Sequence, residues 1–206
     1  MLDHLLVDLI AAVQESFDRA FLEREAVEEH FQVDVFLGDV FWEASYSLPG
    51  ESQPPRVRAD LAIEWPTWSQ TAYRSWSMGE TPSDWPEALL ELGVRVQRLA
   101  QAPVADQVQR ILPPSSPPLG TETLVRTATT IEEVRTELDP GSEAADVSWS
   151  IETTYEGELH FDERALEDPS ALAPVVEALT GWVSSTLVRL ADLPLTFLPP
   201  DPAEAS

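Results

Sequence analysis

Apolar residues recur along the chain with two spacings, and these spacings predict the elements of the fold. Through residues 2–29 they return every three or four positions, which predicts an amphipathic helix. From Phe31 onward apolar and polar residues alternate, as in half-buried strands. The alternation predicts strands at 31–35, 40–48 and 57–65. Gly38-Asp39 is predicted to turn the chain between the first two.

The middle of the chain is predicted to continue as a strand and then a helix. Residues 68–78 follow Pro66 and would complete a four-stranded antiparallel meander. Thr81-Pro82-Ser83-Asp84 has the form of a helix start, with a hydroxyl cap and an early proline. The apolar stripe of the helix behind it, which ends near residue 100, would comprise Trp85, Leu89, Leu92, Val96 and Leu99.

The second half is predicted to follow a similar plan. A short helix at 104–112 and a stiff proline-rich connector at 113–118 lead to a strand region at 121–138. A strand at 147–155 would turn at Glu156-Gly157 into 158–162. The last helix would begin at Asp168-Pro169 and contain Gly181 at a bend or a close packing point. The remaining predictions are one compact unit over 1–193 and a frayed tail over 194–206.

This order of elements predicts an α+β fold, with antiparallel β-meanders packed against amphipathic helices. The two parts, about 1–101 and 102–193, are candidates for similar α-β-β-β-α halves. The supporting matches are Ala59-Asp60-Leu61 with Ala145-Asp146-Val147, and Arg98-Leu99-Ala100 with Arg189-Leu190-Ala191. Convergent patterning of strands and helices explains these matches about as well as a duplication does.

Composition removes several kinds of chemistry. All twelve basic residues are arginines, and the chain of 206 residues contains no lysine, cysteine or asparagine. Thiol and lysine nucleophiles, cysteine-bound metals and disulfides are therefore excluded. With 37 acidic residues the net charge is −25, which argues against direct binding to nucleic acids or to an anionic membrane. No signal peptide is evident, and we expect a cytoplasmic protein without a cofactor.

The charge is uneven along the chain. It is −9 over residues 1–50 and −9 over 151–206, but only −2 over 51–100. We expect the first and last helices to carry much of the surplus, while the segment with Trp65, Trp68, Trp76 and Trp85 is close to neutral.

No motif with a known chemistry is present. None of His4, His30 and His160 has the spacing of a metal ligand set, so the favoured interpretation is a solvated histidine. A metal site could still form in space from His30 or His160 and some of the carboxylates. The compact group His160-Phe161-Asp162-Glu163 is predicted to lie exposed at a strand end.

Tryptophan is unusually frequent, with seven residues. Trp42, Trp65, Trp149 and Trp182 lie on apolar faces and are predicted to be core. On a strand at 68–78, one face would combine residue types that are common at interfaces: Trp68, Gln70, Arg74, Trp76 and Met78. This face is either a partner-binding or dimer surface, or the core side with Arg74 at its rim.

Three functions remain open. The first is a non-enzymatic, acidic protein-interaction module of the chaperone, adaptor or inhibitor type, which binds a basic protein partner or forms a homodimer. The second is a nucleic-acid mimic, with carboxylates of the terminal helices in place of phosphates. The third is a small-ligand-binding protein or enzyme with a cavity between the sheet and the helices, where convergent polar groups would include a perturbed His160 or a glutamate. The element order and acidity are similar to those of small secretion-chaperone-like and immunity-type proteins, although no motif assigns a family.

Overall fold

The computed structural model describes residues 4–20, 27–36, 38–48, 54–137 and 145–199. Its centre is a six-stranded antiparallel sheet with the order β1-β2-β3-β4-β6-β5. The strands are β1 (Val27–Phe36), β2 (Asp39–Ser47), β3 (Val57–Trp65), β4 (Glu87–Leu99), β5 (Val125–Glu137) and β6 (Ala145–His160). The predicted α+β class, with an antiparallel sheet and helices, is confirmed.

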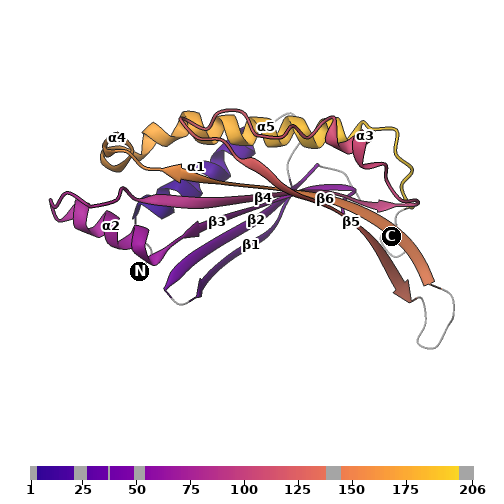
Figure 1. Cartoon of the computed structure of the whole chain (residues 1–206), viewed down its shortest axis with the longest axis horizontal. Helices are drawn as coiled ribbons and strands as arrows, with labels where there is room; N and C mark the ends of the chain where they lie inside the picture. Colours follow the sequence, from indigo (N-terminus) through magenta and orange to yellow (C-terminus); the bar gives the residue numbers. More distant parts are fainter. Residues whose placement is uncertain (1–3, 21–26, 37, 49–53, 138–144, 200–206) are drawn as a thin grey trace.

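Helices cover one face of the sheet. Figure 1 shows α1 (His4–Ala20) and α5 (Ala173–Ala191) side by side on this face, while the strands curve away from them at both ends. The uncovered face is therefore concave. The smaller elements are α2 (Thr67–Ser77), α3 (Ala105–Gln109), α4 (Glu163–Glu167) and the 3₁₀ helix η1 (Pro169–Leu172).

The core lies between the two long helices and the sheet. On β3 every second residue from Val57 to Trp65 is buried, as a strand with one packed face requires. Phe17 of α1 stacks on Tyr46 of β2, and Trp182 of α5 contacts Tyr155 of β6 edge to face. The stretch Ser170–Ala191 is long and apolar enough to cross a membrane by length and composition. In the fold its apolar residues pack on α1 and on the sheet.

Two elements in the middle of the chain have the opposite type to the one predicted. The predicted strand at 68–78 is wrong, because the chain forms helix α2 there. The predicted helix behind Thr81-Pro82 is also wrong, because Glu87–Leu99 is the strand β4. Side chains that face the core alternate along β4 with side chains on the opposite face. The core-facing residues are Ala88, Leu90, Leu92, Val94 and Val96. The leucine-rich run fits both periods, and pairing with β3 and β6 selects the strand.

Helix α2 is fastened to the sheet through polar contacts. The Ser69 hydroxyl donates to the Glu87 carbonyl oxygen at 2.7 Å and accepts from the Glu87 N–H at 2.8 Å. The Asp39 carboxylate accepts bonds from the N–H and hydroxyl of Thr67, which caps the start of the helix and lowers the pKa of Asp39. These contacts place α2 beside the first residue of β4.

Several boundaries also differ from the predictions. The predicted helix over 2–29 extends too far, because β1 begins at Val27. The hairpin turn is one residue off, because Asp39 already pairs with Phe36. No turn occurs at Glu156-Gly157, since β6 continues to His160. Glycine is needed at 157 because a Cβ there would lie 2.8 Å from Leu124 Cδ2 and 3.1 Å from the Thr123 carbonyl oxygen.

Gly181, the end of the chain and the two Arg-Leu-Ala matches have the following positions in the fold. Gly181 is not a close packing point, because nothing lies within 4 Å of a Cβ placed there. Residues 194–199 are hydrogen-bonded to the end of β4 and the residue after it: Ala100 N–H donates to Thr196 O, and Leu198 N–H donates to Arg98 O. Residues 200–206 lie outside the described residues. The two Arg-Leu-Ala matches occupy a strand end and a helix end, so they are not structurally equivalent.

We expect Ser69→Ala to lower the free energy of unfolding by about 1–3 kcal/mol, because the partly buried N–H and carbonyl of Glu87 would lose their partner. Thr71→Ala on the same helix is the control, since its exposed hydroxyl donates to the Thr67 carbonyl oxygen within the helix. Urea unfolding measures both changes. Equal effects of the two substitutions would mean that the Ser69–Glu87 hydrogen bonds between α2 and β4 do not contribute to stability.

Candidate functional site

The uncovered face of the sheet carries an unusual concentration of carboxylates. Alternation along β2, β3, β4 and β6 directs the side chains opposite to the core residues onto this face. One row across the four strands contains Glu43, Ala62, Glu91 and Glu156, and the next contains Phe41, Glu64, Leu89 and Glu158. Together with Glu122, which precedes β5, these rows line a groove of about 720 Å³.

We call this groove the acidic groove, defined by its six glutamates: Glu43, Glu64, Glu91, Glu122, Glu156 and Glu158. No lysine or arginine lines it in the described part of the chain. Apolar side chains lie between the acids, among them Phe41, Leu89 and Val125, of which Val125 is 53% exposed. The groove therefore offers both carboxylates and apolar surface.

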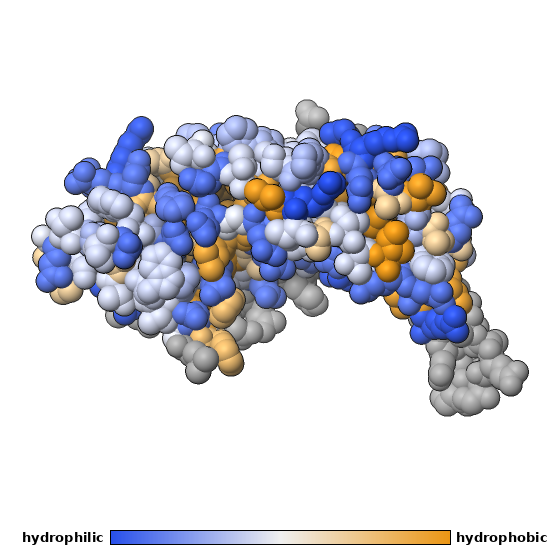
Figure 2. Space-filling view, in the orientation of Figure 1, coloured by the Kyte–Doolittle hydropathy of each residue, from blue (hydrophilic) through white to orange (hydrophobic). Residues whose placement is uncertain are grey.

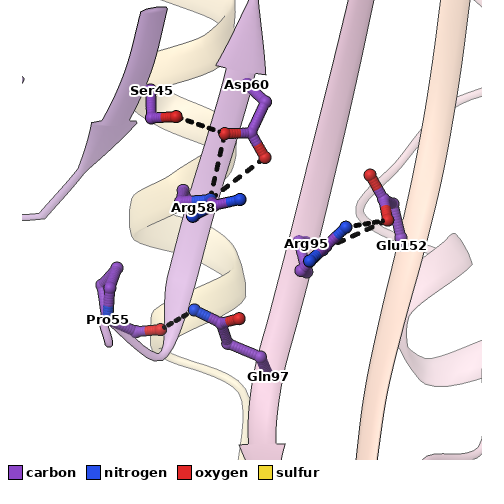
Figure 3. A network of polar contacts seen from close by, with 7 residues as sticks. All are labelled: Ser45, Pro55, Arg58, Asp60, Arg95, Gln97 and Glu152. Atoms are coloured by element: carbon purple, nitrogen blue, oxygen red, sulfur yellow. Dashed lines mark hydrogen bonds and ion pairs between the residues drawn. The ribbon is translucent and has the colours of Figure 1, made fainter. Parts of the chain in front are cut away.

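The arginines of the same face lie at its other end and are already paired. Figure 3 shows this end, with α5 behind the sheet. Arg58 binds Asp60, which also accepts a bond from Ser45, and Arg95 binds Glu152 on β6. Because these contacts occupy both guanidinium groups locally, they leave the charge of the acidic groove uncompensated.

Like charges face each other directly in the groove. Glu91 on β4 and Glu156 on β6 are register partners, so their side chains are adjacent across the strands. Burial, and then the nearby charge of Asp39, raise the pKa of Glu64. Like charges on this face repel one another, so replacing some of these acids would stabilise the fold. A bound basic ligand would also offset this repulsion.

A second feature lies at the edge of this face, around His160. Its Nε2 is 2.9 Å from Glu87 Oε2 and 3.9 Å from Glu158 Oε2, while its Nδ1 is 3.8 Å from Glu122 Oε1. His160 and Glu122 also line a cavity of about 640 Å³ with Trp85, Phe161 and Leu172. Burial, and then the charge of Glu158, raise the pKa of Glu87, whereas the interaction with His160 lowers it.

The predicted partner-binding residues lie on helix α2 rather than on one strand face. Trp68 and Met78 are exposed, by 46% and 70%. Gln70 is buried and donates to the carbonyl oxygens of Gly38 and Trp65, and it accepts from Arg74. Trp76 is half-buried and stacks on Tyr73. Gln70 and Trp76 thus hold the helix in place, and Trp68, Arg74 and Met78 are exposed.

Other predicted residues have simpler positions. Trp42 and Trp65 are fully buried as predicted, whereas Trp149 and Trp182 are partly buried. Trp85 is exposed by 42%. His4 is exposed, and the side chain of His30 lies outside the described residues. The expectation that the last helix carries much of the acid is wrong, because α5 contains one acidic residue, Glu177.

Sequence reasoning missed the acidic groove. Its acids come from five separate segments, and each looks like an ordinary exposed residue of an alternating strand. Figure 2 shows that hydrophilic residues dominate the visible side of the molecule and that hydrophobic ones form small separate areas there. No protein-family model, curated protein or solved structure matches this chain, so the function is inferred from the geometry itself.

Removing one member of the facing pair should stabilise the protein. We expect Glu91→Gln to raise the free energy of unfolding by about 0.2–1 kcal/mol at low ionic strength, because Glu156 then lacks a like charge opposite. The gain should shrink in 1 M salt. Glu132→Gln, which removes an exposed acid opposite Ser150 on the neighbouring hairpin, is the control. A loss of stability, or a gain unaffected by salt, would count against repulsion in the groove.

The raised pKa of Glu64 leads to a pH-dependent prediction. Because folding favours the protonated carboxyl, ionised Glu64 lowers stability at pH 7 and this penalty disappears as the pH falls through the folded-state pKa. Glu64→Gln should therefore raise the free energy of unfolding at pH 7 by no more than about 0.5 kcal/mol, and with it the urea midpoint. The advantage should vanish in a series of midpoints down to pH 3. An advantage that grows toward acid would refute the assignment.

Proposed function

We propose that this protein is a non-enzymatic interaction module that binds a basic segment of another protein in its acidic groove, as a cytoplasmic chaperone, adaptor or inhibitor. The observation that carries the proposal is the collection of six glutamates from five segments around one groove, without a basic residue in its described lining. Elsewhere on this face, Arg58 and Arg95 form ion pairs with neighbouring acids, so they do not neutralise the charge of the acidic groove.

The composition of the groove favours arginine and lysine side chains as ligands. Such side chains combine an apolar stem with a charged head, and they cover apolar surface while the head stays near water or a carboxylate. Phe41, Leu89 and Val125 offer the apolar contact, and the glutamates offer the charge. Arginine would also form bidentate bonds with single carboxylates.

The overall charge supports the same function through kinetics. A cleft lined by one sign of charge raises the rate at which an oppositely charged partner arrives, and this rate falls with ionic strength. The chain carries a net charge of −25, so the long-range field and the groove have the same sign. A basic partner would be attracted at a distance and oriented at the groove.

A second candidate surface for a partner or a second copy is the exposed part of α2. Trp68 lies beside a hollow of about 340 Å³ that also contains Thr71, Ser75 and Pro82. A tryptophan exposed by 46% is of the type that anchors protein interfaces. This surface lies outside the acidic groove, so substitutions separate the two.

The experiment measures binding of a fluorescent arginine-rich peptide by anisotropy at 50 and 200 mM salt. A variant with Glu43, Glu64, Glu91 and Glu156 changed to Gln should bind at least about tenfold more weakly, a loss of about 1.4 kcal/mol. The control has the same change in charge outside the groove, with Asp8, Glu15, Glu167 and Glu177 changed to Asn or Gln.

The outcomes separate the possible surfaces. Little loss in the control supports the groove, and equal losses in both variants would mean that net charge alone attracts the peptide. A loss in Trp68→Ala/Met78→Ala that exceeds the loss in the groove variant would move the interface to α2. Light scattering of the same samples reports whether the chain forms dimers.

A further inference from the structure

The cluster around His160 differs from the acidic groove because it combines an imidazole with carboxylates at ligand distances. One donor atom each from Glu87, Glu158 and His160 lies within 4.8 Å of the other two. Donor atoms about 2.1 Å from a tetrahedral ion are about 3.4 Å apart, so small side-chain movements suffice to complete the site.

The sheet fixes where these side chains start. Glu158 and His160 are two residues apart on β6 and share a face, and Glu87 is the register partner of His160 on β4. The Ser69 hydroxyl holds both backbone polar groups of Glu87. Three ligands therefore come from rigid elements, as preorganised metal sites require.

Glu122 adds an independent observation on the far side of the ring. His160 directs Nε2 toward Glu87 and Glu158, while Nδ1 faces the Glu122 carboxylate at 3.8 Å. Histidines that bind metals usually donate their other N–H to a carboxylate, which fixes the tautomer and the orientation of the ring. Here Nε2 faces the two ligand carboxylates, and Nδ1 lies 3.8 Å from Glu122 Oε1, a separation that a small side-chain movement would shorten to a hydrogen bond.

The three glutamates around His160 give the cluster a negative charge, which favours a bound cation. His160 is the one basic group that forms an ion pair with Glu87, Glu122 or Glu158 among the described residues. The adjoining cavity of about 640 Å³ gives an ion access from solvent and room for a water or a further ligand.

We propose that Glu87, Glu158 and His160 bind one divalent transition-metal ion of the Zn²⁺ class, with Glu122 orienting the imidazole. One nitrogen and two carboxylate oxygens suit Zn²⁺ better than Mg²⁺ or Ca²⁺, which prefer oxygen ligands throughout. The site shares Glu122 and Glu158 with the acidic groove, whereas Glu87 and His160 do not line it, so variants at Glu87 and His160 test the metal site separately from the proposed peptide binding.

The test is calorimetric titration of the chelator-treated full chain with ZnCl₂ at pH 7.5 in 150 mM NaCl and 5 mM MgCl₂. We expect one saturable site per chain. His160→Gln and Glu87→Gln should weaken binding at least about tenfold, and Glu122→Gln by about tenfold, as for other orienting carboxylates. Glu132→Gln on β5 is the control, because its exposed carboxylate lines neither the acidic groove nor the cavity at His160, and it should change the affinity less than about twofold.

A measurement on the wild type alone guards against misfolded variants. The chain has three histidines, so imidazole NMR signals resolve the ligand directly. We expect Zn²⁺ to shift one imidazole and to stop its titration with pH, because the bound ring cannot accept a proton at that nitrogen. The absence of a saturable site, an equal loss in Glu132→Gln, or three unshifted imidazoles would each overturn the proposal.

Discussion

The pairing of β4 with β6 is the interaction on which the rest of the structure depends. It joins the β1–β4 meander to the β5–β6 hairpin through partners that run from Glu87 and His160 to Val96 and Ile151. The same register places Leu92 beside Tyr155 in the core and Glu91 beside Glu156 on the open face. Because side chains alternate, a slip of one residue would exchange the two faces and expose the core.

Burial on one face allows repulsion on the other. A buried leucine or valine contributes about 1.5–3 kcal/mol, and α1, α5 and the sheet bury many of them together. A pair of facing carboxylates costs about 1 kcal/mol or less. The fold can therefore hold several unpaired glutamates in a groove, and the reduction in stability is small beside the contribution of the core.

The errors of prediction concentrate where local patterns fit two periods. Ser69, Gln70, Tyr73 and Trp76 turn inward at helical spacing, although the aromatic residues around them favour a strand. The run Glu87–Leu99 contains a good helical stripe and a good alternation together. Hydrogen-bonded partners on both sides select the strand there, and no local window contains those partners. By contrast, the regular alternation of Val57–Trp65 fits one period, and it was predicted correctly.

The sequence by itself determined the α+β class, the strand at Val57–Trp65, the strong acidity and the absence of thiol and lysine chemistry, because these follow from composition and local period. Only the tertiary structure decided where the acids gather. Glu43, Glu91 and Glu156 are far apart in the chain and become neighbours through strand pairing, as do Glu87 and His160. The physical reason is that register arises from non-local hydrogen bonds and shared burial, whereas each of these residues alone looks like an ordinary solvated side chain.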